Sequence, residues 1–208
     1  MATLRSGIFG TYYGSTKGTS ESLTTSEMRM NADYIYSSLK SSGWSINSIA
    51  AILGNIQAES TINPGRWEGD AVYEGAGFGL VQWTPHSKYI DWCSSEGIDD
   101  YTEMDANLLR ILYEVDNKIQ WIPTSTYNFS FELFTISDLP VSELSKAFLL
   151  NYERPKDQSV SVQNYRASLS EAWYEYLTGT QPDDPVIKPK KKKGYKFILF
   201  KKTRRIYG

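Results

Sequence analysis

A glutamate at position 59 has the sequence setting of a proton donor. Ile49, Ile52, Ile56 and Glu59 follow the spacing that places side chains on one helix face, so the carboxyl group is expected at the rim of an apolar core. Partial burial disfavours the charged form of a carboxyl group and raises its pKa above the value of about 4.3 for a free glutamate. Such a group keeps its proton near neutral pH and can protonate a leaving group. The alternative is a solvated glutamate at a helix end.

The helix that carries Glu59 is predicted to stop soon after it, because Pro64 and Gly65 prevent its continuation. A glycine-rich segment follows at residues 75–85 and reads Gly-Ala-Gly-Phe-Gly-Leu-Val-Gln-Trp-Thr-Pro. It differs from a phosphate-binding loop, since it lacks a preceding apolar strand and a following helix with Lys and Thr. Its glycines either form a tight turn with positive φ or let a sugar ring approach the main chain closely. Trp83 either offers a flat apolar face to such a ring or belongs to the core.

Three motifs occur in order along the chain: Glu59-Ser60 ahead of Asn-Pro-Gly at residues 63–65, Gly-Phe-Gly-Leu-Val-Gln-Trp at residues 77–83, and Asn-Tyr-Glu-Arg-Pro at residues 151–155. Together they resemble the lysozyme domain of bacteriophage tail-associated muralytic proteins and, more distantly, lytic transglycosylases and goose-type lysozymes. The resemblance covers about residues 24–179. It implies that Glu59 is the catalytic acid and that Gly79 and Gln82 line the glycan cleft. Further candidates for substrate binding are Ser60, Trp83 and Tyr152.

The third motif closes a predicted helix, and its tyrosine is the candidate for a role in the cleft. We expect Tyr152 to face the cleft, with its hydroxyl hydrogen-bonded to Glu59 or to substrate. Glu153 and Arg154 are expected to be structural, because adjacent side chains point in different directions and only one can face the site. The alternative is a helix terminus whose arginine lies near the negative end of the helix dipole.

Hydrolysis of a glycosidic bond uses a second carboxylate, which activates water or stabilises the positive charge that develops on the sugar. Asp70 and Glu74 are the candidates for this second acid, ranked above Glu68, and all three lie on the loop between the first two motifs. Each of them is otherwise a solvated surface residue. Without a second acid, the substrate's N-acetyl group or a sugar hydroxyl would complete the reaction, and the latter would make the protein a lytic transglycosylase.

Residues that occur only once exclude other mechanisms. His86 is the only histidine, so this sequence cannot assemble a zinc site with two histidines. Cys93 is the only cysteine and cannot form an internal disulfide; beside Trp92 it is expected to be a small buried hydrophobic residue. The spacing of His86 and Cys93 next to Pro85 gives no support for a catalytic pair. We expect no metal and no cofactor.

The fold is predicted to be α+β and mainly helical, with a lysozyme-like domain and a small hairpin or sheet at residues 75–83. Thr24 and Glu27 form a capping box for a helix that ends near Gly43, and a second helix runs from Ser45 to Glu59. Further helical patterns occur at residues 89–96, 104–118, 141–152 and 164–177.

Charge and composition divide the chain further. Residues 1–23 are rich in Gly, Ser and Thr and are interpreted as an arm without its own core, ahead of the domain at residues 24–179. Residues 180–193 are interpreted as a Pro- and Lys-rich linker, and residues 194–208 as a basic, apolar tail. Residues 186–208 hold ten basic and no acidic residues, which leaves 12 basic against 24 acidic residues in the rest. The tail could add a strand to a partner, bind an anionic polymer, or remain solvated; we favour strand addition.

These features predict a muramidase that cleaves peptidoglycan between N-acetylmuramic acid and N-acetylglucosamine, carried on a phage tail for local penetration of the cell wall. The alternatives are a lytic transglycosylase, an endolysin that lyses the host, and a tail protein that binds glycan without cleaving it. The expected partners are peptidoglycan and phage tail proteins, the latter through the amino-terminal arm and residues 186–208, with no nucleic acid. The amino terminus lacks the apolar centre of a secretory signal, and no apolar stretch reaches the roughly 18 residues of a membrane span. We therefore expect synthesis in the host cytoplasm and assembly into the virion.

Overall fold

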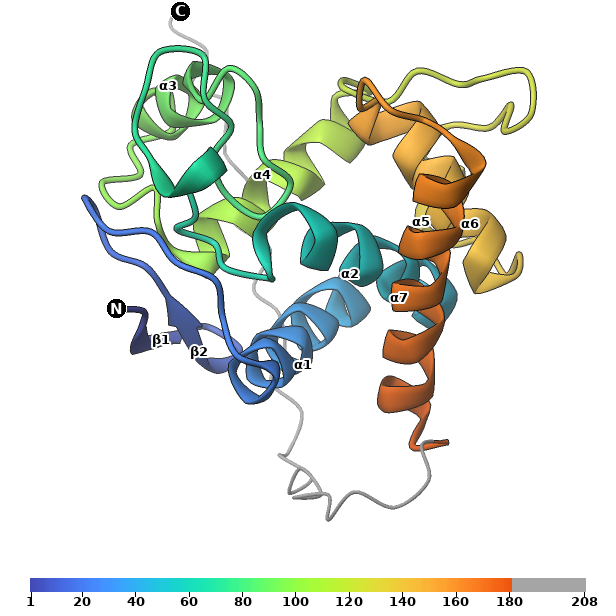
Figure 1. Cartoon of the computed structure of the whole chain (residues 1–208), viewed down its shortest axis with the longest axis horizontal. Coiled ribbons are helices and arrows are strands. Elements are labelled where there is room, and N and C mark those ends of the chain that lie inside the picture. Colours follow the sequence, from blue (N-terminus) through green and yellow to red (C-terminus); the bar gives the residue numbers. More distant parts are fainter. Residues whose placement is uncertain (181–208) are drawn as a thin grey trace, which may run out of the picture.

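Helix α2 (Ile46–Ser60) lies at the centre of the computed structural model, which describes residues 1–180 (Figure 1). The Ser45 hydroxyl caps its first turn by accepting from the Ser48 amide at 3.1 Å. The helix ends because Thr61 and Ile62 adopt positive φ angles of 53° and 58°. Its apolar residues between Ile49 and Ile56 are fully buried, so α2 forms the axis of the core, and Glu59 lies in its last turn.

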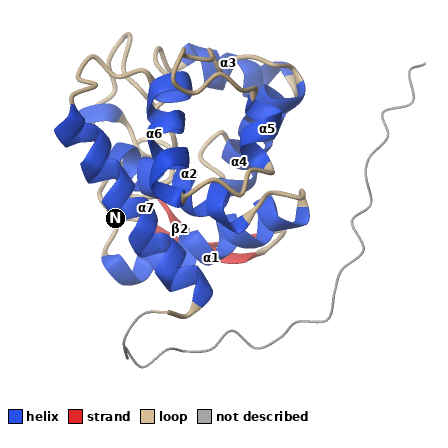
Figure 2. Cartoon of the chain, turned by 90° about the vertical axis from the view of Figure 1, so that its right-hand side faces the viewer, coloured by secondary structure: helices blue, strands red, loops and turns tan. Residues whose placement is uncertain are grey.

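Three helices surround α2. Helix α1 (Thr25–Ser41) begins at the predicted capping box, in which the Thr24 side chain and the Glu27 carboxylate satisfy each other's backbone amides. Helices α6 (Val141–Phe148) and α7 (Val160–Thr178) pack against α2 and against each other, as the side view shows (Figure 2). The predicted helical patterns for these segments are confirmed. The helix expected at residues 141–152, however, changes into a π-helical segment, η2 (Leu149–Glu153).

The remaining helices divide between two lobes. One lobe contains the loop after α2, a 3-10 turn (Glu68–Asp70) and helix α3 (Ser87–Ser95). The other contains α5 (Phe131–Thr135), α6 and the loops around them; α5 is a short helix that the sequence pattern did not predict. Helix α4 (Met104–Asp116) runs between the two lobes (Figure 1).

The amino-terminal residues form a β-hairpin that packs on the helical domain. Strands β1 (Thr3–Gly7) and β2 (Gly10–Gly14) pair antiparallel, with Thr3 opposite Gly14 and Gly7 opposite Gly10. Tyr12 is only 1% exposed and meets the ring of Tyr34 edge to face at 5.2 Å between centroids. These residues therefore belong to the domain and do not form a separate arm.

Buried polar residues fix the segment that follows the hairpin. The Asn63 side chain accepts from the amide of Ser15 at 3.0 Å and donates to the Glu21 carbonyl at 2.8 Å.

The prediction of an α+β, mainly helical fold is confirmed, but the sheet is the amino-terminal hairpin and not residues 75–83. Within residues 1–180, that segment forms two isolated bridges, which pair Trp67 with Phe78 and Phe78 with Trp83.

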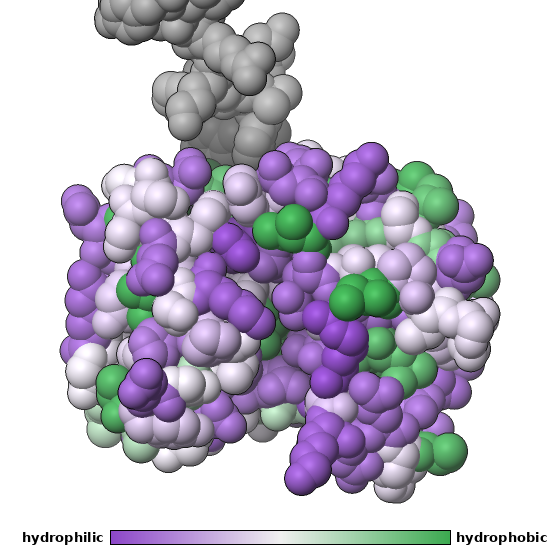
Figure 3. Space-filling model, turned by 90° about the horizontal axis from the view of Figure 1, so that it is seen from above, coloured by the Kyte–Doolittle hydropathy of each residue, from purple (hydrophilic) through white to green (hydrophobic). Residues whose placement is uncertain are grey.

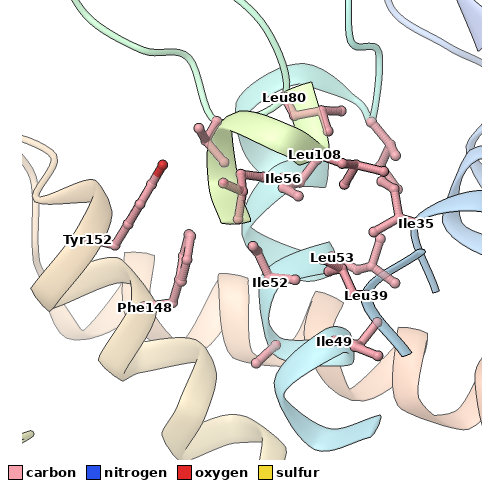
Figure 4. Packing of buried hydrophobic residues seen from close by; sticks show 14 of the residues in the cluster. Ile35, Leu39, Ile49, Ile52, Leu53, Ile56, Leu80, Leu108, Phe148 and Tyr152 are labelled. Atoms are coloured by element: carbon pink, nitrogen blue, oxygen red, sulfur yellow. The ribbon is translucent and has the colours of Figure 1, made fainter. Parts of the chain in front are cut away.

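The core extends without interruption from α1 through α2 to η2. Figure 4 shows Ile35 and Leu39 on one side of α2, and Phe148 and Tyr152 stacked side by side on the other. The Phe148 and Tyr152 rings are 4.4 Å apart between centroids and nearly parallel. This packing holds η2 against the same helix that carries Glu59.

None of the helices within residues 1–180 is long and apolar enough to cross a membrane. The predicted docking strand at residues 194–208, and all but the first residue of the predicted linker at 180–193, lie outside the described residues.

Candidate active site

The surface is hollowed between the two lobes. Figure 3 looks down on the molecule and shows this hollow separating two masses, and Figure 1 shows that α3 belongs to one mass and α5 and α6 to the other. Helix α2 lies between and beneath them. Glu59, in the last turn of α2, keeps 20% of its side chain exposed. The carboxyl is thus partly buried, as the helix periodicity predicted, and still reaches solvent.

Arg166 of α7 fixes the orientation of Glu59. Its Nη2 makes an ion pair and hydrogen bond with Glu59 Oε1, and its Nη1 donates to the Asn55 carbonyl of α2 at 3.3 Å. The arginine side chain is only 10% exposed.

Glu153 of η2 is a second carboxyl group, close enough to Glu59 for the two charges to interact. The residue is half-buried, its Oε1 is inaccessible to solvent, and that atom has no hydrogen-bond partner among residues 1–180. Burial raises the pKa of Glu153 well above its ordinary value of 4.5, and the negative charge of Glu59 raises it further, whereas Arg166 acts in the opposite direction. Burial and the charge of Glu59 both favour the neutral form of Glu153. Its location beside Glu59 and Arg166 gives it more than the structural role expected from its place in the motif.

We predict that Glu153→Gln will reduce the pH dependence of stability. Below about pH 4.3 glutamate is protonated in the folded and unfolded chains alike. As the pH rises, the unfolded chain releases this proton first, so the free energy of unfolding falls until the pH passes the raised pKa of the folded state. Glutamine resembles the neutral acid and binds no proton, so the variant should escape this loss.

Urea denaturation between pH 4 and 8 measures the effect. The stability of Glu153→Gln relative to the unsubstituted protein should increase steadily with pH. Glu171→Gln, the same change at an exposed position of α7, serves as the control and should give a constant difference. A constant difference for Glu153→Gln as well would show that Glu153 titrates normally.

Tyr152 and Trp83 are buried and meet at a buried carboxylate, Glu114 of α4. The Tyr152 hydroxyl donates to Glu114 Oε2 at 2.5 Å, and Trp83 Nε1 donates to Glu114 Oε1 at 3.0 Å. Tyr152 is 1% and Trp83 3% exposed. The expected hydrogen bond from Tyr152 to Glu59 is therefore wrong, and both aromatic rings belong to the core.

Glu114 joins segments that are far apart in the sequence. Arg110 Nε adds an ion pair to Glu114 Oε1 at 2.8 Å, and the guanidinium lies over the Trp92 ring at 5.1 Å. Burial raises the pKa of Glu114, while the hydrogen bonds from Tyr152, Arg110 and Trp83 lower it. The carboxylate thus links the second motif, helix α4 and the third motif. Glu114 was not among the predicted site residues, although a glutamate and an arginine four residues apart within the predicted helix 104–118 were a usable signal.

The other predicted binding residues shape the loop that borders the hollow. Ser60 is fully buried, and its hydroxyl donates to the Leu80 carbonyl at 2.8 Å. Gln82 is half-buried with a positive φ of 51°, and its Nε2 donates to the Gly79 carbonyl at 2.8 Å and the Arg66 carbonyl at 3.2 Å. These side-chain contacts hold the chain between α2 and α3 in one conformation.

Gly79 serves packing and not the approach of a sugar. Its φ is +84°, and a Cβ at this position would lie 2.6 Å from Asn107 Oδ1 and 2.9 Å from the Trp83 ring. Asn107 is itself fully buried and accepts from the Leu80 amide at 2.9 Å through the same oxygen. Neither the oxygen nor the ring can move away cheaply, so only glycine fits.

We predict that Gly79→Ala will destabilise the protein more than Gly75→Ala. The two glycines have nearly equal φ angles, +84° and +85°, but a Cβ at Gly75 would meet no atom within 4 Å. Gly75→Ala should cost about 1–2 kcal/mol for the left-handed conformation alone. Gly79→Ala should cost roughly 1–3 kcal/mol more, because it also overpacks the core. Urea denaturation of both variants measures the difference, and equal losses would contradict the steric explanation.

The candidates for a second acid lie on the loop after α2, and all three are exposed. Asp70 Oδ1 accepts from the Ser20 hydroxyl at 2.9 Å and pairs with Arg66 Nε at 3.4 Å. Glu68 Oε2 accepts from the Gly77 amide at 2.8 Å. Asp70 is thus held by the amino-terminal segment and Glu68 by its own loop, and Glu74 is solvent-exposed. The carboxyl that the structure places with Glu59 is instead Glu153.

The single histidine and cysteine have structural surroundings. The His86 ring meets Trp67 at 5.0 Å between centroids, and Cys93 is buried, which raises the pKa of its thiol and makes it a poor nucleophile. Within residues 1–180, no three His, Cys, Asp or Glu side chains gather closely enough to hold a metal ion. The chemistry of the described site is that of carboxyl groups.

Comparisons with known proteins identify the family of the chain. A family model described as phage tail lysozyme matches residues 30–177, which include α2, the glycine-rich loop, α4, η2 and most of α7. The chain is also similar to Morphogenesis protein 1 of Bacillus phage B103, with 45% identity over 158 residues. The matched segment covers 76% of this chain but only 42% of that relative, so the chain spans less than half of the relative's length. Most of the chain, including all three motifs, thus falls within one family match, and the chain belongs to the phage tail lysozyme family.

Proposed function

We propose that this protein is a muramidase that cleaves the glycan strand of peptidoglycan between N-acetylmuramic acid and N-acetylglucosamine. The observation that carries the proposal is the partly exposed carboxyl of Glu59 in the last turn of α2, held by Arg166 and close to the buried carboxyl of Glu153. Membership of a lysozyme family supports the same chemistry.

The reaction begins with proton transfer. A glycosidic oxygen leaves poorly until it is protonated, and Glu59 donates that proton while the C–O bond breaks and positive charge develops on the sugar. The electron pair of the broken bond stays on the leaving oxygen. Once Glu59 has lost its proton, its carboxylate faces the positively charged sugar and stabilises it electrostatically.

Two acceptors can complete the reaction. Attack by water gives a hydrolase, and attack by a hydroxyl of the same sugar gives a lytic transglycosylase. The lytic transglycosylase is kept as a second candidate function because of the contacts of Asp70. Ser20 and Arg66 hold the Asp70 carboxylate at the amino-terminal segment. Hydrolysis then needs a water molecule oriented by groups other than Asp70.

Mass spectrometry of digested peptidoglycan tests the proposal. We expect fragments with reducing N-acetylmuramic acid ends, and Glu59→Gln digests serve as the control. Anhydro ends, each one water lighter, would assign the protein as a transglycosylase. Binding to the wall without release of fragments would show a protein that holds glycan but does not cleave it.

We propose further that the protein acts from the phage tail during penetration of the cell wall. The family description names phage tail lysozymes, and the relative from phage B103 carries the name of a morphogenesis protein, which fits incorporation into a particle. The strongly basic segment at residues 186–208 is the proposed contact with other tail proteins. Detection of the chain in purified particles tests this location, and its presence only in lysates would favour an endolysin.

A further inference from the structure

We propose that Glu59, Glu153 and Arg166 act as one unit in which the two carboxyl groups hold a single proton, and that Glu153 is the positioning residue for this proton. The inference rests on the proposed function, in which Glu59 donates a proton to the glycosidic oxygen. It extends that function by naming the group that keeps a proton available beside an arginine.

Three separate elements bring the unit together. Glu59 comes from α2, Glu153 from η2 and Arg166 from α7. Arg166 cannot follow Glu59 away from the site, because its second nitrogen is bound to the Asn55 carbonyl. The inaccessible Oε1 of Glu153, which has no partner within residues 1–180, would be costly to bury as a carboxylate and is less costly as a neutral acid.

The π-helical segment holds Glu153 from both sides. On one side, the Tyr152 hydroxyl is fixed by Glu114. On the other, Arg154 adopts a left-handed conformation, and its Nη1 donates to the Asn151 carbonyl at 2.6 Å and to the Gln120 carbonyl. Such π-helical insertions occur often at functional sites. Here the insertion ends in a residue whose side chain is directed into the protein.

The charges that surround Glu153 decide its state. Glu59 on α2 and Glu114 on α4 favour its neutral form, whereas Arg166 on α7 and Arg154 on its own segment favour the ionised form. Burial is the largest influence and also favours the neutral form. The balance leaves the pair of Glu59 and Glu153 with one proton and one negative charge, which Arg166 neutralises.

The charge of the unit changes in the direction that the reaction needs. When the pair gives its proton to the glycosidic oxygen, both carboxyl groups are ionised, and the unit changes from neutral to a net charge of −1. This charge appears as the sugar becomes positive, so the two attract. If water completes the reaction, its hydroxide binds the sugar and its proton returns to the pair, which restores the starting state.

The pH profile of kcat/KM tests the proposal, because it reports the ionisation of the free enzyme. Glu153→Gln leaves Glu59 as the single titrating carboxyl group beside the arginine, so loss of its proton no longer creates two adjacent negative charges. The alkaline limb of the profile should therefore move to lower pH by about one unit or more. Glu171→Gln on the exposed face of α7 should leave the profile unchanged. An unchanged limb in Glu153→Gln would overturn the proposal, as would an equal loss of activity at every pH, since Glu153 would then itself be the donor.

A second measurement does not depend on activity. Carbon-13 NMR of side-chain carboxyl groups should show that replacing either glutamate by glutamine moves the titration of the other to lower pH. Independent titrations would refute the shared proton. Coupled titrations without any cleavage of peptidoglycan would leave the unit intact and refute the proposed enzyme, so the two failures can be told apart. If Glu153→Gln fails to fold, the unsubstituted protein and Glu59→Gln give the same comparison.

Discussion

Glu59→Gln is expected to lower kcat for the cleavage of peptidoglycan by about 10²–10⁴-fold, the contribution of a general acid. Glutamine keeps the shape of the side chain, and its Oε1 can still accept from Arg166, but it has no acidic proton. KM should change little, because glycan contacts elsewhere in the cleft remain. Release of soluble fragments from purified cell walls measures the rate.

Two controls make this result specific. Circular dichroism and urea denaturation should show that Glu59→Gln folds normally, and Glu171→Gln should clear cell walls like the unsubstituted protein. Undiminished clearing by Glu59→Gln would show that this residue is not the acid, and the proposed mechanism would fail.

Glu114→Ala is expected to lower the free energy of unfolding by about 3–5 kcal/mol, the usual loss when one partner of a buried ion pair is removed. The substitution leaves the guanidinium of Arg110 without its carboxylate in the core. It also leaves the Trp83 indole nitrogen and the Tyr152 hydroxyl without an acceptor. Urea denaturation measures the loss.

The matched controls separate charge from shape. Glu114→Gln keeps the volume and part of the hydrogen bonding, so it should lose less than Glu114→Ala. Glu171→Ala, on the exposed face of α7, should change stability by no more than about 0.5 kcal/mol. A loss below about 1 kcal/mol in Glu114→Ala would show that the three donors find other partners and that the carboxylate does not organise the site.

The sequence was sufficient where the determining contacts are local. The capping box of Thr24 and Glu27 and the serine cap at Ser45 lie within three residues of their partners, and both helices begin where they were expected. The periodicity of α2 correctly placed Glu59 at the edge of the core. These signals depend only on neighbours along one helix, so periodicity and capping rules can detect them.

Contacts between distant segments could not be inferred in the same way. Arg166 is 107 residues from Glu59, and Tyr152 is 38 residues from Glu114. Tyr152 was expected in the cleft because its hydroxyl can bind a carboxylate or a substrate, and only the fold shows that its partner is Glu114. Glu153 was expected to be structural because only one of two adjacent side chains was expected to face the site. The direction of its side chain depends on a π-helical insertion that no sequence pattern marked.

The location of the sheet was also decided by tertiary contacts. The glycines at 75–79 were consistent with a hairpin, but Gly79 is required by the proximity of Asn107 and the Trp83 ring. The amino-terminal residues, in contrast, looked too polar for a core contact of their own. Their hairpin is stabilised because Tyr12 packs against Tyr34 and because Asn63 binds the chain at Ser15.

The position of Glu114 has a mechanical consequence. Trp83 belongs to one lobe of the molecule and Tyr152 to the other, and the Glu114 carboxylate on α4 accepts a hydrogen bond from each of them. Moving the lobes apart would break both hydrogen bonds at once inside the core. The groove between the lobes is therefore expected to keep a fixed width. Under the proposed function, a glycan strand would enter it already extended and the cleaved strand would leave along the groove, with little loss of conformational freedom in the protein.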